Sequence, residues 1–99
     1  MYVILTSKIG EFRTEIGDGL NAIEAYDYLF FGRPRAHFVI ASIHGEPRIT
    51  IVDEAPPPAI NVIPSKFLPK FATLDDARRA LQQLASTPSL DVTLVRVTL

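Results

Sequence analysis

The chain has 99 residues, of which 47% are apolar and 21% charged, and its net charge is −1 at pH 7. This balance is typical of one small globular domain spanning residues 1–99, and it excludes an intrinsically disordered chain. The absence of cysteine excludes disulfide frameworks, thiolate nucleophiles and cysteine-ligated metals. There is no basic leader and no apolar run near the roughly 20 residues that cross a bilayer, so we expect a cytoplasmic protein with no membrane partner.

Two strands are predicted at the N-terminus. Residues 1–7 carry apolar side chains on both faces, which is typical of a strand inside a sheet that is covered on both sides. In residues 11–16, Phe12, Thr14 and Ile16 alternate with charged side chains, and this alternation indicates a half-exposed strand.

Residues 20–32 fit two structures. On a helix, Asn21 and Glu24 would form an N-terminal capping box, and Gly32 would suit the helix end. The apolar stripe of that helix would consist of Ala22, Ile23, Tyr26, Leu29 and Phe30. On a strand, the density of aromatic side chains is favourable, but strict alternation fails at residues 29–31. We expect a helix here, with a strand as the alternative.

A hairpin is predicted in the middle of the chain. Residues 35–43 are apolar on both faces and indicate a central strand. The sequence His-Gly-Glu-Pro at 44–47 favours a turn into a second strand at 48–53, in which Ile49 and Ile51 point to one face.

Residues 54–72 form an extended proline-rich segment that holds five of the chain's eight prolines and an unusual number of large apolar side chains. Proline stiffens the unfolded chain, so ordering such a segment costs less conformational entropy than ordering an ordinary loop. We therefore expect this segment to lie across the fold as a cover that buries Phe67 and Phe71. The sequence leaves open whether it covers this chain or a partner.

The clearest helix signal begins at Thr73. Its hydroxyl suits an N-cap, and Asp75 and Asp76 suit the positive end of the helix dipole. The apolar stripe would consist of Leu74, Ala77, Leu81 and Leu84. Pro88 is expected to end this helix, and residues 91–99 are expected to form a β-branched strand inside the sheet.

These elements occur in the order strand, strand, helix, strand, strand, helix, strand (β-β-α-β-β-α-β). We therefore predict an α+β fold built on an antiparallel or mixed sheet of about five strands. Both helices are expected on one face of the sheet, with the proline-rich segment as a cover elsewhere.

The sequence offers little for catalysis. It has no Gly-x-Ser-x-Gly motif, and Ser42 and His44 stand close together only at the end of a strand. A metal site needs at least three converging ligands, and only His44 with Glu46 and Asp53 approaches that number. We predict no catalytic residue, no metal and no cofactor.

Nucleic acid is not an expected partner. Arg33 and Arg35 follow an aromatic cluster, but the chain lacks the basic-glycine-aromatic pattern of sheet-type RNA binders. Acidic residues also outnumber basic ones, so the chain has no general attraction for phosphate.

Two functions remain open. The first is a non-catalytic interaction or accessory protein, which would bind a protein partner or associate with itself as a homodimer. Its apolar and aromatic surface would include Tyr26, Tyr28, Phe30, Phe67 and Phe71. The second is a small-ligand-binding domain or small enzyme with a pocket beneath the proline-rich segment, where His37 or Asp27 would act.

Overall fold

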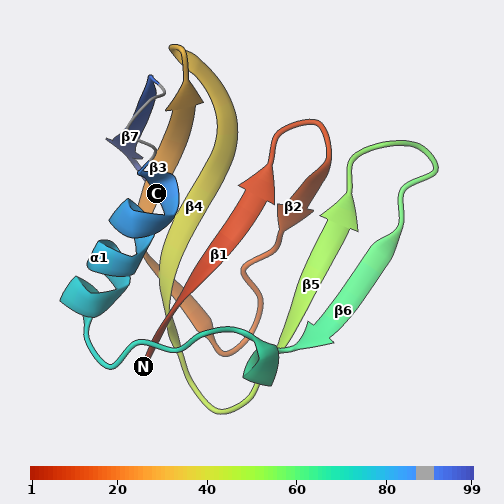
Figure 1. Cartoon of the computed structure of the whole chain (residues 1–99). Helices are drawn as coiled ribbons and strands as arrows, with labels where there is room; N and C mark the ends of the chain where they lie inside the picture. Colours follow the sequence, from red (N-terminus) through yellow and green to blue (C-terminus); the bar gives the residue numbers. More distant parts are fainter. Residues whose placement is uncertain (87–90) are drawn as a thin grey trace.

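Strands dominate this fold. The computed structural model describes residues 1–86 and 91–99, and its strands form one antiparallel sheet (Figure 1). The strands are β1 (Tyr2–Lys8), β2 (Phe12–Thr14), β3 (Leu20–Phe30), β4 (Arg33–Ile43), β5 (Arg48–Asp53), β6 (Ile60–Pro64) and β7 (Val92–Val97). The helical elements are the 3-10 helix η1 (Ser65–Phe67) and the α-helix α1 (Leu74–Ala85). The order of strands across the sheet is β6-β5-β2-β1-β4-β3-β7.

The predicted fold of five strands and two helices is wrong. The sheet has seven strands, and α1 is the one α-helix within residues 1–86 and 91–99. The segment expected as the first helix is β3, and part of the proline-rich segment forms β6. β3 pairs with β4 on one side and with β7 on the other, so its aromatic side chains gain cross-strand neighbours on both sides. These contacts outweigh the local helix signals.

The turn between β3 and β4 explains why this long hairpin forms. Phe31 and Gly32 are its central residues, with φ angles of 51° and 76°. Two positive φ angles are characteristic of a type I′ turn, whose twist matches the right-handed twist of the flanking strands. Gly32 adopts this conformation without a steric penalty, whereas Phe31 adopts it with strain. The glycine that suited a helix end therefore closes a hairpin.

A β-bulge in β3 changes the direction of its side chains. Ala22 pairs with Ala41 and Glu24 pairs with Ile40, so Ile23 is the extra residue. Because successive side chains of a strand point to opposite faces, the extra residue turns Glu24 toward the face that carries α1. The bulge thus brings a carboxylate between the sheet and the helix.

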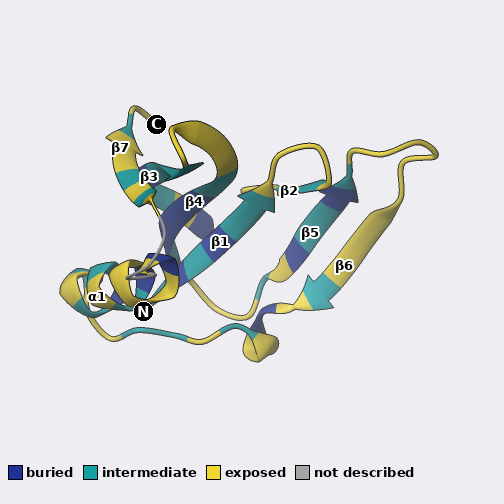
Figure 2. Ribbon diagram, turned by 45° about the horizontal axis from the view of Figure 1, so that its top comes forward, coloured by how far each residue is buried: buried dark blue, intermediate teal, exposed yellow. Residues whose placement is uncertain are grey.

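The two faces of the sheet are buried by different elements (Figure 2). On one face α1 packs against β1, β4 and β7. The buried side chains there are Phe38, Ile40, Ala77 and Leu81. On the other face a second cluster joins four strands, and Ile63, Leu68 and Val97 pack against it. Its buried members are Val3, Leu5, Leu20, Ala25, Val39, Ala41, Ile43 and Ile49.

The prediction that Thr73 caps the second helix is confirmed. The Thr73 hydroxyl accepts a hydrogen bond from the Asp76 amide at 3.0 Å, and Asp75 and Asp76 lie in the first turn. The helix ends at Ala85, and the predicted stop signal Pro88 lies outside the described residues.

The proline-rich segment covers the fold only in part. Leu68 packs on the cluster away from α1, and Phe71 packs on the cluster beneath α1. The backbone of Phe71 exchanges two hydrogen bonds of 2.8 Å with Tyr2, which fixes the segment beside β1. Phe67, however, is 70% exposed, so the expectation that it is buried within the chain is wrong. It sits on η1, where the chain turns away from β6 before reaching the core (Figure 1).

Candidate interaction surface

Large apolar side chains are exposed along β6 and η1. Ile60, Val62 and Phe67 are 70%, 48% and 70% exposed, and Figure 2 shows the exposed colour over most of β6 and again over η1, with a buried stretch between them. The Lys66 ammonium lies 5.5 Å from the centroid of the Phe67 ring, which is a cation–π distance. We call Ile60, Val62, Lys66 and Phe67 the β6–η1 surface. Monomeric proteins normally protect apolar edge strands, because such edges invite association.

Prolines shape the outer edge of β6. The Asp53 amide donates to the Ala59 carbonyl at 2.8 Å, so alternate residues from Ala59 onward turn their backbone groups toward β5. The backbone groups of the residues between them point away from the sheet. Pro58 and Pro64 occupy two of these outward positions and have no N–H to offer. The edge therefore presents side chains to a partner rather than a continuous row of backbone donors.

The structure separates the five aromatic residues that were expected to share one surface. Tyr26, Tyr28 and Phe71 are half-buried in the cluster beneath α1. Phe30 is half-buried at the β3–β4 turn. Phe67 lies on the β6–η1 surface and is the most exposed of the five.

Ile60 and Val62 belong to the segment 54–72 that was expected to act as a cover, so their exposure was not predicted. The signal that could have revealed it is the pair of prolines that brackets them. Proline within a strand is confined to edge strands or to the strand's ends. Pro58 and Pro64 therefore indicate a strand whose outer side faces solvent.

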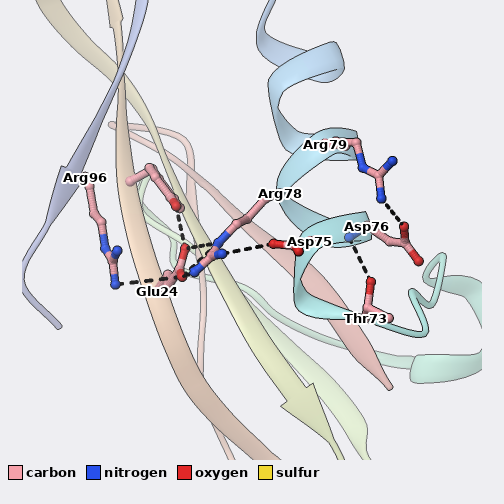
Figure 3. A network of polar contacts seen from close by, with 8 residues as sticks. Glu24, Thr73, Asp75, Asp76, Arg78, Arg79 and Arg96 are labelled. Atoms are coloured by element: carbon pink, nitrogen blue, oxygen red, sulfur yellow. Dashed lines mark hydrogen bonds and ion pairs between the residues drawn. The ribbon is translucent and has the colours of Figure 1, made fainter.

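A buried polar cluster joins β3 to α1 (Figure 3). The carboxylate of Glu24 is 2% exposed, and Arg78 Nε donates to its two oxygens at 3.0 and 3.1 Å. The Tyr26 hydroxyl donates to the same carboxylate. Arg96 of β7 lies 3.7 Å from Glu24 Oε1 and adds a second positive charge. The cluster holds β3, β7 and α1 together through one anion.

The charge of Glu24 is strongly stabilised in the fold. Hydrogen bonds from Arg78 lower the pKa of Glu24 from its ordinary value of 4.5 to about 2, although burial acts in the opposite direction. The pKa of Tyr26 is raised, first by burial and then by its hydrogen bond to Glu24. Neither group is therefore poised to exchange a proton near neutral pH, and the cluster fits a structural role better than acid–base catalysis.

Three polar residues form a row across β3, β4 and β1, on the face away from α1. Asp27 pairs with His37, and His37 pairs with Ser7. His37 Nδ1 lies 2.9 Å from Asp27 Oδ1. The Ser7 hydroxyl accepts a hydrogen bond from the Thr14 amide at 2.9 Å, and no hydrogen bond joins Ser7 to His37 among the described residues. The row thus lacks the nucleophile–base contact that serine catalysis requires.

A pocket of about 300 Å³ lies beneath the proline-rich segment. Its lining residues are Ile4, Thr6, Leu68, Pro69, Phe71, Ala80 and Leu84. Thr6 is the one polar residue among them, and neither His37 nor Asp27 belongs to the lining. The two residues expected to act in such a pocket instead bond to each other on the opposite face of the sheet.

The part of the chain that the structure describes also bears on metals, membranes and nucleic acid. No three His, Asp or Glu side chains gather there in a metal-binding arrangement. The helix that lies in this part is too short and too polar to cross a bilayer. Arg33 and Arg35 are exposed near the tip of the β3–β4 hairpin. The prediction that they do not serve nucleic acid stays a prediction.

Comparison with protein-family models, with curated proteins and with solved structures gave no match for this chain.

Proposed function

We propose that this chain is a non-catalytic interaction protein of the cytoplasm, which binds a protein partner through the β6–η1 surface. The proposal is supported mainly by one observation, the exposure of Ile60, Val62 and Phe67 along one edge of the sheet. Burying an apolar side chain of this size contributes about 1.5–3 kcal/mol. A partner that covers these three side chains therefore gains affinity without any catalytic group.

The chemistry of this surface fits a protein better than a small molecule. A small-molecule site is concave and encloses its ligand, whereas Ile60, Val62 and Phe67 are each about half exposed or more. Aromatic residues are enriched in the buried centres of protein interfaces, where a few large side chains carry most of the binding energy. Phe67 is the anchor in this proposal, and Ile60 and Val62 extend the contact along β6.

Site-specific photo-crosslinking tests this function. A photoreactive phenylalanine analogue placed at position 67 or 62 is expected to capture one discrete protein in cells of the source organism. The matched control is position 9, because Ile9 is also exposed (55%) but lies in the turn after β1. The same captured protein from all three positions, or none from positions 62 and 67, would contradict the proposal.

A second candidate function is binding of a small apolar molecule, and the pocket beneath the proline-rich segment favours it. Its volume of about 300 Å³ lies at the lower end of the range for ligand sites, and its lining is apolar except for Thr6. Indole is a suitable probe, because it is flat, apolar and carries one hydrogen-bond donor. If the pocket binds small apolar molecules, indole should raise the melting temperature of the protein, and the rise should increase with the occupancy of the pocket.

A pair of variants separates specific from nonspecific binding of the probe. Ala80→Leu places a larger side chain in the lining and should abolish the shift caused by indole. Ala72→Leu adds the same side chain at an exposed position outside the pocket and should preserve it. Equal shifts in both variants would show that the pocket is not the binding site.

A further inference from the structure

The two edges of the sheet differ in what their backbones offer. The outer edge of β6 is bracketed by Pro58 and Pro64, as described above. β7 forms the opposite edge and is the last strand of the sheet. Figure 1 shows β7 outermost beside β3, with no other labelled element on its far side.

The pairing of β7 with β3 fixes which of its backbone groups are free. The Phe31 amide donates to the Asp91 carbonyl at 2.8 Å, so Asp91 and every second residue after it turn toward β3. The backbone groups of Val92, Leu94 and Arg96 therefore point outward. In the described part of the chain, none of these outward groups has a backbone partner. Strand β7 contains no proline and carries Arg96 as its one charged residue.

We propose that β7 pairs antiparallel with β7 of a second copy of this chain, with the two-fold axis at Leu94. In this register Leu94 faces Leu94 of the second copy, and Val92 faces Arg96 of the second copy. Each of the three residue pairs exchanges two backbone hydrogen bonds, since all three residues offer both N–H and C=O. The result is one continuous sheet across two copies.

The sequence along β7 suits this self-pairing. Arg96 falls opposite an apolar residue, so no like charges face each other, whereas an axis at Arg96 would oppose two guanidinium groups. Val95 is 41% exposed, and in the Leu94-centred register it faces Thr93 of the second copy. Strand addition of this kind gains its affinity from main-chain hydrogen bonds and its register from side-chain pockets and charges.

The prolines of β6 explain why the partner is a second copy and why assembly stops at two. A sheet with two open edges would pair β6 with β7 of the next molecule and grow into a fibre. Pro58, which precedes β6, and Pro64, its last residue, leave Ile60 and Val62 as the two outward residues of β6 that have an N–H, so β6 offers a shorter ladder than the three outward residues of β7. The β7 edges of two copies therefore offer the longer ladder, and pairing them leaves no β7 edge open and closes the assembly at two copies. This inference does not depend on the proposed function, because the two surfaces lie on opposite edges of the sheet.

Cysteine cross-linking tests the strand pairing and its register, and the natural chain contains no cysteine to interfere. In the proposed register Thr93 of one copy lies opposite Val95 of the other copy in a non-hydrogen-bonded pair. The Cα separation of such a pair is about 4.5 Å, which suits a disulfide. A mixture of Thr93→Cys and Val95→Cys proteins should give a disulfide-linked dimer under mild oxidation. Each variant alone should give far less of the disulfide-linked dimer. No dimer from the mixture, or an equal yield from Val95→Cys alone, would overturn the proposal.

A proline variant tests the same edge by sedimentation equilibrium. Val92→Pro removes an outward amide at the first residue of β7, where proline is tolerated, and should raise the dimer dissociation constant by about tenfold or more. Val62→Pro makes the same change on the other edge and should leave the dimer intact. Wild-type protein that stays monomeric at millimolar concentration, or equal weakening by both variants, would overturn the proposal.

Discussion

Glu24 shows how one extra residue redirects a side chain. Without the bulge at Ile23, strand alternation would place this carboxylate on the face away from α1. With the bulge, it lies 2% exposed against Arg78. A buried carboxylate is tolerated when it is paired and hydrogen-bonded, as this one is by Arg78 and Tyr26.

The lowered pKa of Glu24 makes the stability of the fold depend on pH. The folded value of about 2 lies below the ordinary value of 4.5, so the charged form is favoured in the folded state. The stabilisation is fully present above about pH 4.5 and is lost as the pH falls toward 2. The difference corresponds to on the order of 3 kcal/mol for this 2% exposed group.

Urea unfolding at several pH values between 7 and 2 measures this effect, with Glu24→Gln as the comparison. The wild-type protein should lose more stability over this range than the variant, because glutamine has no proton to gain. Glu15→Gln is a matched control, since Glu15 is exposed and should change the pH dependence little. Identical pH profiles for the wild type and Glu24→Gln would show that the cluster does not stabilise the charge.

Gly32 is a second residue whose role can be tested alone. Its φ of 76° is in the left-handed region, and a Cβ added there would meet no atom within 4 Å. Gly32→Ala should therefore cost about 1–2 kcal/mol through backbone conformation alone. Gly17 also has open space around it but has no positive φ, so Gly17→Ala should cost nothing measurable. Chemical denaturation of both variants makes the comparison, and equal effects would argue against the type I′ turn.

The elements differ in how well the sequence predicts them. Helix α1 is predictable, because its cap, its first-turn acids and its apolar stripe are all local signals. Strand β3 is not predictable in this way, because Asn21, Glu24 and Gly32 have the residue types and spacing that are typical of the two ends of a helix. Its true signal is tertiary: aromatic residues at every second position pair across β4 and β7. Local patterns cannot show that both neighbouring strands are present.

The cap of α1 gives a prediction for an element as a whole. Thr73→Ala removes the hydrogen bond to the Asp76 amide and should destabilise the domain by about 0.5–2 kcal/mol. Thr73→Ser keeps the hydroxyl and should retain most of that stability. Thermal unfolding of the two variants measures the difference. A serine variant as unstable as the alanine variant would assign the loss to packing of the Thr73 methyl group rather than to the cap.

For the whole molecule, the sequence predicts which segments are strands better than it predicts the order of those strands in the sheet. Apolar and β-branched stretches correctly indicate β1, β4, β5 and β7 as strands. The expectation that residues 91–99 lie inside the sheet is wrong, because β7 forms one of its edges. The order of strands depends on pairings between residues far apart in the chain, such as Tyr28 with Leu94. The exposure of β6 and η1 could not be predicted from the sequence either. A stiff apolar segment has the same sequence pattern whether it covers its own chain or faces solvent.

The position of β3 between β4 and β7 decides the sheet order and therefore which strands form its edges. Proton NMR tests it directly through nuclear Overhauser contacts between α-protons, which are close in the non-hydrogen-bonded pairs of antiparallel strands. The structure predicts such contacts between Asp27 and His37, and between Tyr28 and Leu94. Sequential amide–amide contacts throughout residues 20–30, without either of these cross-strand contacts, would show that the segment is a helix and would contradict the seven-stranded sheet.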